Sequence, residues 1–284
     1  MREETVTTYY PLGIHEMDTK NRQVGNTGEI TDDSEMAIML AMSIIEKKEF
    51  NKEDVKNHYT SWMNSGPLDM GITISNALKN NTINPNSQAN GALMRLAPLA
   101  IYASKLDNNT LISLSDAYCA ITHSHSLCRD TNRIWVWAIA KAIRDEGSKE
   151  ELYQAMLAIA PTLTDNTLLL STLKEAKTTA PEHCDEWHMG WVLIAFHLSI
   201  HTLLTCDTFE EGIKAITLRA GDADTNAAIY GMLAGAIYGV EGIPSRWIKA
   251  LKPTQVIKEL LEDNEVEMEI LANSLVKELL EIYL

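Results

Sequence analysis

The chain has 284 residues, of which 45% are hydrophobic, and it carries a formal net charge of −15 at pH 7. This length and apolar content support a large core, and no stretch has the composition of a linker, so we predict one domain over residues 1–284. The acidic charge argues against nucleic acid or an anionic membrane surface as a partner.

The sequence also bears on where the protein resides. Its first residues are charged and polar, without the apolar segment of a signal peptide, and no apolar run is long enough for a membrane span. The four cysteines show no CxxC pairing, which is more typical of buried reduced thiols than of a disulfide framework. We therefore expect a soluble, cytoplasmic protein without a membrane partner.

The chain begins with a segment that carries little structural signal. Residues 1–30 are polar, contain glycine and show no periodicity, which predicts an irregular arm. The first clear helix starts at Thr31-Asp32-Asp33, where Thr31 or Asp32 would be the N-cap. Because the helix that follows is apolar nearly all round, it should lie deep in the fold and hold its first turn rigidly. We call Thr31–Asp33 the first acidic corner.

Apolar residues at helical spacing predict helices along the rest of the chain. Strand signals are nearly absent and no repeat of about 20 to 50 residues is found, so we expect a single compact multi-helix domain of the all-α class. The predicted helical segments are Asn51–Trp62, Gly71–Leu78, Leu111–Ile121, Thr131–Ile143, Glu150–Ile159, Leu168–Ala176, Trp187–Cys206, Phe209–Leu218, Ala223–Tyr238 and Pro253–Leu284.

Arg95 is the one charged residue in the apolar run from Gly91 to Leu99. A buried guanidinium is costly without partners. We therefore expect Arg95 to have a structural role and to pair with a carboxylate or with backbone carbonyls.

Two pairs of histidines stand out. His123 and His125 are two positions apart, so they cannot face the same way on one helix, although one histidine in a cleft could contact a substrate. His197 and His201 are four apart and could ligate a metal ion, but the glutamate of the zincin motif is absent between them. We therefore expect the second pair to pack in the fold.

A second acidic helix start lies far along the chain, at Gly221-Asp222-Ala223-Asp224-Thr225-Asn226. We call Asp222–Thr225 the second acidic corner. Carboxylates are favoured at a helix N-terminus even without a further role. The small residues that follow, Ala227 to Ala236, would let other helices approach closely, which predicts that this helix is the central post of the domain.

The alternative to simple capping is that the two corners face each other across one cleft. Four converging carboxylates would repel by roughly 4 kcal/mol per pair at about 4 Å and an effective dielectric of about 20, unless cations lie between them. The ligand atoms would all be oxygen, which suits Mg²⁺, Mn²⁺ or Ca²⁺. An EF-hand is excluded because Ala227 and Leu233 occupy its glycine and glutamate positions. Six protein oxygens cannot fill two octahedral shells, so water and substrate would supply the rest.

Several segments resemble the ADP-ribosylglycohydrolase family, the relatives of the dinitrogenase-reductase-activating glycohydrolase. The matches follow the family's order along most of the chain. They are Thr31-Asp32-Asp33-Ser34-Glu35-Met36-Ala37, Trp62 with Gly66-Pro67 and Gly71, Asn90-Gly91-Ala92-Leu93-Met94-Arg95-Leu96-Ala97-Pro98-Leu99, Thr122-His123, Gly190-Trp191-Val192, Gly221 to Ala228, Gly231, Gly235-Ala236, Gly239 and Ile243-Pro244.

The resemblance implies an all-helical domain with a site for two Mg²⁺ ions, for which Mn²⁺ is a possible substitute. The metal-ligand positions of the family match Thr31, Asp32, Asp33, Asp222, Asp224 and Thr225. It also implies that Asn90, Gly91 and His123 contact ADP-ribose. The expected partner is ADP-ribose or an ADP-ribosylated protein, and we expect the chain to act as a monomer.

The chain departs from the family pattern in two places. Family members usually begin with a glycine-rich helix followed by an acidic residue near the scissile bond, and the resemblance implies that this sequence starts just after that element. Glu29, Glu16, Glu4 or Asp33 could replace the acidic residue, and we take Asp33 and Glu29 as the candidate catalytic residues. Secondly, Ala220 stands where the family usually has glycine, a change that should be tolerated if the backbone there is not at positive φ.

The leading hypothesis is therefore magnesium-dependent hydrolysis of the N- or O-glycosidic bond between ADP-ribose and a protein side chain or related adduct. The alternative is a catalytically impaired ADP-ribose-binding relative that lacks the N-terminal carboxylate. A third hypothesis is an unrelated helical protein with capped acidic helix starts. The linkage that is cleaved, to arginine, serine or another acceptor, is left open.

Overall fold

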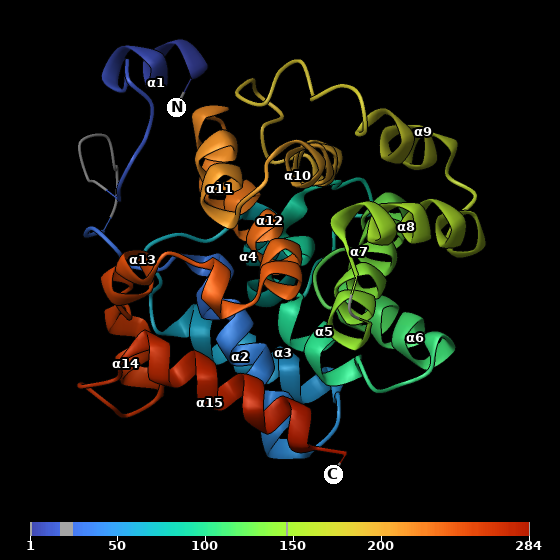
Figure 1. The fold of residues 1–284 in the computed structure, drawn as a ribbon. Coiled ribbons are helices and arrows are strands. Elements are labelled where there is room, and N and C mark those ends of the chain that lie inside the picture. Colours follow the sequence, from blue (N-terminus) through green and yellow to red (C-terminus); the bar gives the residue numbers. More distant parts are fainter. Residues whose placement is uncertain (1, 18–24, 146, 284) are drawn as a thin grey trace.

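The computed structural model describes residues 2–17, 25–145 and 147–283 (Figure 1). In these ranges the chain is helical, with isolated bridges between Glu29 and Lys252 and between Ala89 and Trp191 in place of β-strands. The predicted all-α class is confirmed. The helices are α1 (Glu3–Tyr9), α2 (Asp32–Lys47), α3 (Lys52–Asn64), α4 (Ile72–Lys79), α5 (Ala97–Ala103), α6 (Asn108–Cys119), α7 (Ser126–Arg144), α8 (Lys149–Leu163), α9 (Thr167–Glu175), α10 (Val192–Thr205), α11 (Phe209–Leu218), α12 (Ala223–Tyr238), α13 (Ser245–Ala250), α14 (Gln255–Leu260) and α15 (Met268–Glu281), with 3₁₀ helices η1 (Asn90–Arg95) and η2 (Val240–Gly242).

Three sequence-based boundaries were wrong. The expected irregular arm over residues 1–30 contains α1, whose acidic first turn complements the helix dipole and whose Val6 is buried. Residues 18–24 of that segment lie outside the described residues. The segment Pro253–Leu284 is divided between α14 and α15, and Trp187 precedes the start of α10.

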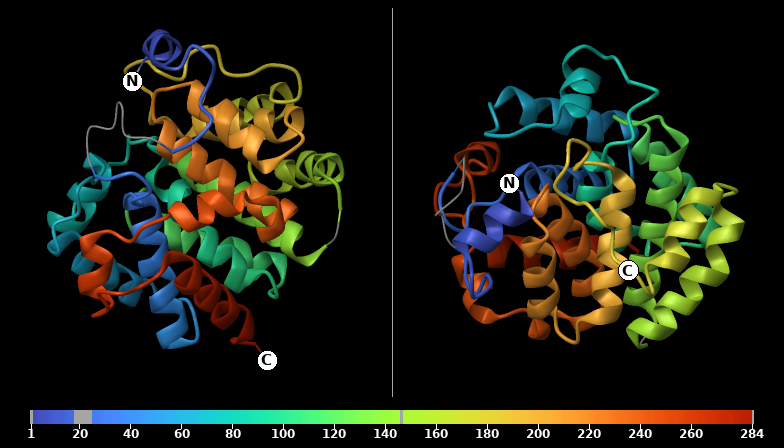
Figure 2. Two further views of the ribbon diagram at one scale, coloured as in Figure 1. Left: turned by 60° about the vertical axis from the view of Figure 1, so that its left-hand side comes forward. Right: turned by 90° about the horizontal axis from the view of Figure 1, so that it is seen from above.

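Helix α12 lies at the centre of the molecule, as its small residues predict (Figure 1). It packs against α7, α10, α11, η1 and the start of α2. The views of Figure 2 show α11 and α12 side by side, with α1 on the outside of this layer. Residues from nearly every helix share one hydrophobic core cluster, and α12 contributes to it, so the second acidic corner is attached to a helix of the core.

Helix α2 is anchored through a buried carboxylate. Glu35 is 3% exposed and accepts hydrogen bonds from Trp62 Nε1 at 2.7 Å and from the Thr254 hydroxyl. These partners come from α3 and from the start of α14. A single side chain therefore ties three helices together one turn beyond the first acidic corner.

Arg95 has the backbone partner that the sequence predicts. Its guanidinium is fully buried and donates to the Gly91 carbonyl and to Thr122 Oγ1, the latter at 2.7 Å. It also lies over the ring of Tyr59, 4.8 Å from the centroid. Arg95 thus connects η1 to the turn before α7 and has a structural role.

The remaining predictions concern histidines, cysteines and the membrane. His197 Nε2 lies 2.7 Å from the Thr179 carbonyl and His201 Nδ1 lies 3.0 Å from the Ala176 carbonyl, which confirms packing roles. The four cysteines are free thiols. Among the described residues, no helix combines the length and the apolar character that crossing a bilayer would require.

Replacing Glu35 should destabilise the whole fold. Glu35→Ala leaves the buried Trp62 and Thr254 donors without their acceptor, which should lower the free energy of unfolding by about 2–4 kcal/mol. Urea unfolding would measure this. The matched control is Glu269→Ala at an exposed position of α15, which should change stability by less than about 0.5 kcal/mol. Equal effects of the two substitutions would contradict the anchoring role.

Candidate metal and ligand site

The first acidic corner is formed at the start of α2. Asp32 is 9% exposed and Asp33 is 2% exposed. Thr31 occupies the N-cap position without making a side-chain cap, and its hydroxyl instead donates to Asp33 Oδ2 at 2.7 Å. The other oxygen of Asp33, Oδ1, is buried without a hydrogen-bond partner. These side chains therefore do not cap the helix, although the simpler interpretation of an acidic helix start required capping.

The second acidic corner is preceded by two left-handed residues. Ala220 has φ +55° and Gly221 has φ +64°. A Cβ at Gly221 would lie 1.9 Å from the Cys184 carbonyl oxygen, so glycine is required there. Asp222 at the N-cap makes no side-chain cap, and its Oδ2 accepts from Asn90 Nδ2 at 2.7 Å.

The condition under which Ala220 was expected to be tolerated is not met. Its positive φ is unfavourable for a residue with a Cβ, by roughly 1–2 kcal/mol. Ala220 is also 1% exposed, which fixes the strained backbone in the interior. The strained residue is therefore separated from Asp222 by Gly221 alone.

The two corners lie within electrostatic range of each other. Burial, together with the carboxylates of Asp69, Asp224 and Asp222, raises the pKa of Asp32 to about 7. Burial likewise raises the pKa of Asp33, as do Asp32, Asp224 and Asp222. The pKa of Asp222 is raised by burial and by Asp224 and Asp69. Carboxylates from both ends of the sequence therefore disfavour each other's ionisation.

Asp69 is a residue that the sequence analysis missed. It is exposed in the loop between α3 and α4, and it acts on carboxylates of both corners. It does not stand at a helix start, so the capping argument could not find it. The available signal was an acidic residue between the chain-breaking residues Pro67 and Gly71, both of which belong to the family-like pattern.

The three residues predicted to contact ADP-ribose do not lie together at the second corner. Asn90 is 6% exposed, bonded to Asp222, and its backbone N–H donates to the Gly190 carbonyl at 2.9 Å. His123 is fully buried beneath Gly91, where an added Cβ would lie 3.2 Å from its Cε1. Burial lowers the pKa of His123 to about 3, so this ring is neutral at ordinary pH. The structure brings Asn90 to the second corner and places His123 behind η1.

The two ring nitrogens of His123 have different surroundings. The Thr122 hydroxyl accepts from Arg95 Nη2 at 2.7 Å and lies 2.8 Å from His123 Nδ1. His123 Nε2 is buried without a hydrogen-bond partner.

One hollow contains side chains of both corners. It has a volume of about 580 Å³, and we call it the corner hollow. Thr31, Asp33 and Asp224 line it, and so does Glu29, whose carboxylate accepts from the Asn26 N–H and from Asn26 Nδ2. Thr225, the remaining predicted ligand, is 6% exposed in the first turn of α12.

The candidates for the missing acidic residue are separated by this geometry. Asp33 and Glu29 line the corner hollow together with Asp224. Glu16 is instead bonded to Arg246 Nε at 2.7 Å, and Glu4 lines a different hollow. Asp33 and Glu29 are therefore the two of the four that lie beside the second corner.

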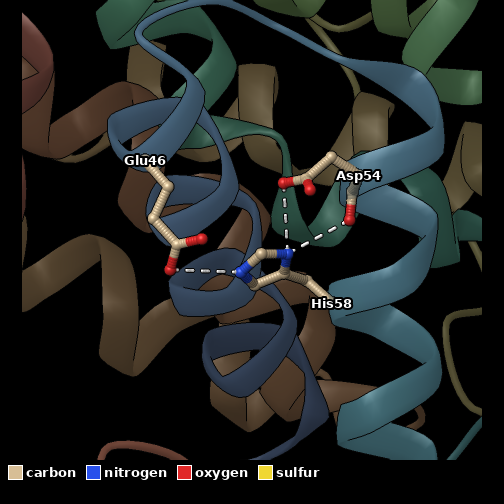
Figure 3. A group of neighbouring side chains, drawn as sticks. All are labelled: Glu46, Asp54 and His58. Carbon is tan, nitrogen blue, oxygen red and sulfur yellow. Dashed lines mark hydrogen bonds and ion pairs between the residues drawn. The ribbon is translucent and has the colours of Figure 1, made fainter.

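Three side chains elsewhere could together ligate a metal ion. Glu46, Asp54 and His58 have ligand atoms within 4.8 Å of one another, a spacing that no three acidic residues of the corners reach in the described chain (Figure 3). However, the carboxylates approach opposite edges of the imidazole, Glu46 Oε1 at 3.5 Å from Nε2 and Asp54 Oδ2 at 3.4 Å from Nδ1. Lys47 Nζ also lies 3.2 Å from Asp54 Oδ1. As arranged here, the cluster is an ion-pair network between α2 and α3.

The fold and site define a class of protein, an all-helical domain in which two acidic helix starts meet beside a hollow. The sequence pattern of the ADP-ribosylglycohydrolase family matches residues 1–278, and the chain belongs to this family of enzymes. The resemblance identified from the sequence motifs is thereby confirmed.

Individual relatives agree with this assignment. The chain is 28% identical to the ADP-ribosyl-dinitrogen reductase glycohydrolase of Rhodospirillum rubrum, over 79% of this chain and 74% of that protein. It is 24% identical to the ADP-ribosylarginine hydrolase Tri1 of Pseudomonas putida, over 83% of this chain and 66% of that protein. A solved structure described as an ADP-ribosylglycohydrolase-related protein complex has a TM-score of 0.77 and 25% identity, covering 96% of this chain and 88% of that one.

The residues of the two corners fit hard divalent cations. Every side-chain atom of the predicted ligands that could bind a metal ion is a carboxylate or hydroxyl oxygen, which suits magnesium or manganese. Asp33 Oδ1 is a buried acceptor without a hydrogen bond, and burial with neighbouring carboxylates raises the pKa values of Asp32, Asp33 and Asp222. A bound cation would relieve both features.

Relieving the strain at Ala220 should stabilise the fold. Ala220→Gly removes the Cβ from a left-handed residue and should raise the free energy of unfolding by about 0.5–1 kcal/mol. The matched control, Ala142→Gly in the right-handed helix α7, should lower it by a similar amount. Chemical denaturation measures both, and a destabilised Ala220→Gly variant would contradict the strain.

The raised pKa values predict a pH dependence. Without divalent ions, the free energy of unfolding should fall as the pH rises from about 4 to about 7, because Asp32, Asp33 and Asp222 bind protons more tightly in the folded chain than in the unfolded one. The shift of Asp32 alone corresponds to up to about 4 kcal/mol.

Urea unfolding with a chelator at about pH 5 and pH 7.5 would measure this dependence. Asp32→Asn should reduce the fall and should be more stable than the unaltered protein at the higher pH, since it removes one repelling charge. Asp165→Asn, at an exposed carboxylate before α9, is the control and should leave the slope unchanged. A slope that is insensitive to Asp32→Asn would be evidence against the raised pKa.

Proposed function

We propose that the chain is a magnesium-dependent hydrolase that removes ADP-ribose from a modified protein side chain or a related adduct. The observation that carries the proposal is the mutual destabilisation of the buried Asp32 and Asp33 and the partly buried Asp222, carboxylates from two distant helix starts. Such an arrangement is costly for stability and is typical of functional sites. Membership of the family, and relatives named as hydrolases of ADP-ribosyl adducts, supply the substrate class.

The proposed ligands of two Mg²⁺ ions are Thr31, Asp32, Asp33, Asp222, Asp224 and Thr225, and Mn²⁺ is a possible substitute. The ions would neutralise the converged carboxylates and hold oxygens of the bound ribose. Asn90 would keep Asp222 oriented through its 2.7 Å hydrogen bond. Gly91, which has no side chain, would allow ADP-ribose to approach η1, while His123 would support that approach from below.

The proposed reaction breaks the bond between the anomeric carbon and the acceptor atom. A water molecule adds to that carbon as positive charge develops on the sugar ring, and it passes a proton to Asp33 or Glu29, which line the corner hollow. The same carboxyl then gives this proton to the acceptor atom, which leaves in its protonated form, and the carboxylate is restored. Whether the acceptor is arginine, serine or another residue is an outcome of the assay below.

The proposal also includes the oligomeric state, the location and the partners of the protein. The net charge of −15 and the four free thiols support a monomeric cytoplasmic enzyme whose partners are ADP-ribosylated proteins and not nucleic acids.

Removing a corner carboxylate should abolish both metal-dependent stabilisation and turnover. We expect Asp32→Asn and Asp224→Asn to lower kcat at least about 100-fold on peptides with arginine- or serine-linked ADP-ribose. Mg²⁺ with ADP-ribose at 100 times its Kd should stabilise the unaltered protein by about 2.7 kcal/mol and the variants much less. Asp165→Asn is the control and should behave like the unaltered protein.

The same measurements separate the alternatives. Release that needs Mg²⁺ and stops with a chelator supports the hydrolase. Binding of ADP-ribose without release from either peptide would identify the catalytically impaired binding relative. No stabilisation by Mg²⁺ and ADP-ribose together would refute both.

A further inference from the structure

The N-terminal arm, which we define as residues 2–17, is attached to the domain at both ends. At its start, the Glu3 N–H donates to Asp185 Oδ2 at 2.7 Å, and Glu3 Oε2 lies 3.6 Å from Arg219 Nε. Near its end, Glu16 accepts from Arg246 Nε at 2.7 Å and from Trp247 Nε1 at 3.3 Å. The arm therefore runs along α11 toward α13 as a strap fixed at two points (Figure 1).

The middle of the arm forms a wall of the corner hollow. Four of its side chains line that hollow opposite residues of both acidic corners. The arm residues are Val6, Tyr10, Ile14 and Met17, and the corner residues are Thr31, Asp33, Ala223 and Asp224. A segment near the N-terminus of the chain is thus brought beside carboxylates from positions as far apart as 33 and 224.

A second hollow lies on the same segment of the arm. It has a volume of about 330 Å³ and shares Tyr10, Ile14 and Met17 with the corner hollow. Lys214 and Trp247 also line the smaller hollow. Because hollows lie on two sides of the middle of the arm, its side chains have room to adjust to a guest while the contacts of Glu3 and Glu16 hold its ends.

The lining of the corner hollow limits what it can accept. Among the described residues, its charged lining side chains are Glu29, Asp33 and Asp224, and none is cationic. The proposed contacts of ADP-ribose, Asn90, Gly91 and His123, are not among the residues that line this hollow. It suits the part of the substrate on the other side of the scissile bond, an acceptor side chain with its neighbouring peptide, which the apolar arm residues can cover.

We propose that Val6, Tyr10, Ile14 and Met17 form the acceptor side of the site, so that the arm selects the protein segment from which ADP-ribose is removed. This inference rests on the proposed function, because the acidic corners place the scissile bond. The arm then acts on recognition of the modified protein and not on the binding of ADP-ribose itself.

Tyr10 and its neighbour provide a matched pair for the test. Tyr10 lines the corner hollow, whereas Tyr9 is 52% exposed and is not among the lining residues. Tyr10→Ala should raise the KM for an ADP-ribosylated peptide roughly tenfold, while the Kd for free ADP-ribose in the presence of Mg²⁺ changes less than about twofold. Tyr9→Ala should change neither quantity.

A second variant tests the attachment of the arm to α13 through Glu16. Glu16→Gln weakens the contact with Arg246 and leaves the lining of the corner hollow intact, and it should raise the peptide KM by a smaller factor with the Kd for ADP-ribose again unchanged. Calorimetry measures the Kd and steady-state release measures the KM.

The outcomes distinguish this inference from the proposed function. A peptide KM and an ADP-ribose Kd that rise together in Tyr10→Ala, or a KM that stays constant in both variants, would overturn the acceptor role while hydrolysis by the unaltered protein stands. If the unaltered protein neither binds ADP-ribose nor releases it, the proposed function fails and the inference fails with it.

Discussion

The placement of like charges in the interior is the constraint on which the rest of this structure depends. Asp32, Asp33 and Asp222 are held close enough to raise one another's pKa values, and a flexible chain would separate them. The fold resists this because each corner starts a buried helix. Glu35 ties α2 to two neighbours, and α12 is enclosed by α7, α10, α11 and η1. Packing energy elsewhere thus offsets an electrostatic cost that is concentrated at the site.

Much of the architecture could be predicted from the sequence, because the signals were local. The apolar first helix, the small residues of α12 and the buried Arg95 each imply a particular environment, and each lies in that environment. The proximity of the two corners was predicted from chemistry, since carboxylates and threonines recurred in the same helix-start pattern. Their assignment as metal ligands stays a prediction.

Other parts of the site could not be predicted because they depend on contacts between distant segments. Asp69 contributes through its distance from two helix starts that are remote in the sequence, and its position between Pro67 and Gly71 does not by itself indicate that proximity. His123 was expected to contact a ligand, but its burial beneath Gly91 depends on how η1 turns around Arg95. The arm was predicted to be irregular because its helix has only seven residues, which leave little periodic signal, and because its attachments at Glu3 and Glu16 are contacts with distant segments.

The close approach at Gly221 has a mechanical consequence. Its backbone rests against the Cys184 carbonyl, and the next residue, Asp185, receives the first N–H of α1. The base of the second corner and the attachment of the arm therefore share one short peptide support. A substitution that alters this support would therefore disturb both the backbone before Asp222 and the first attachment of the arm.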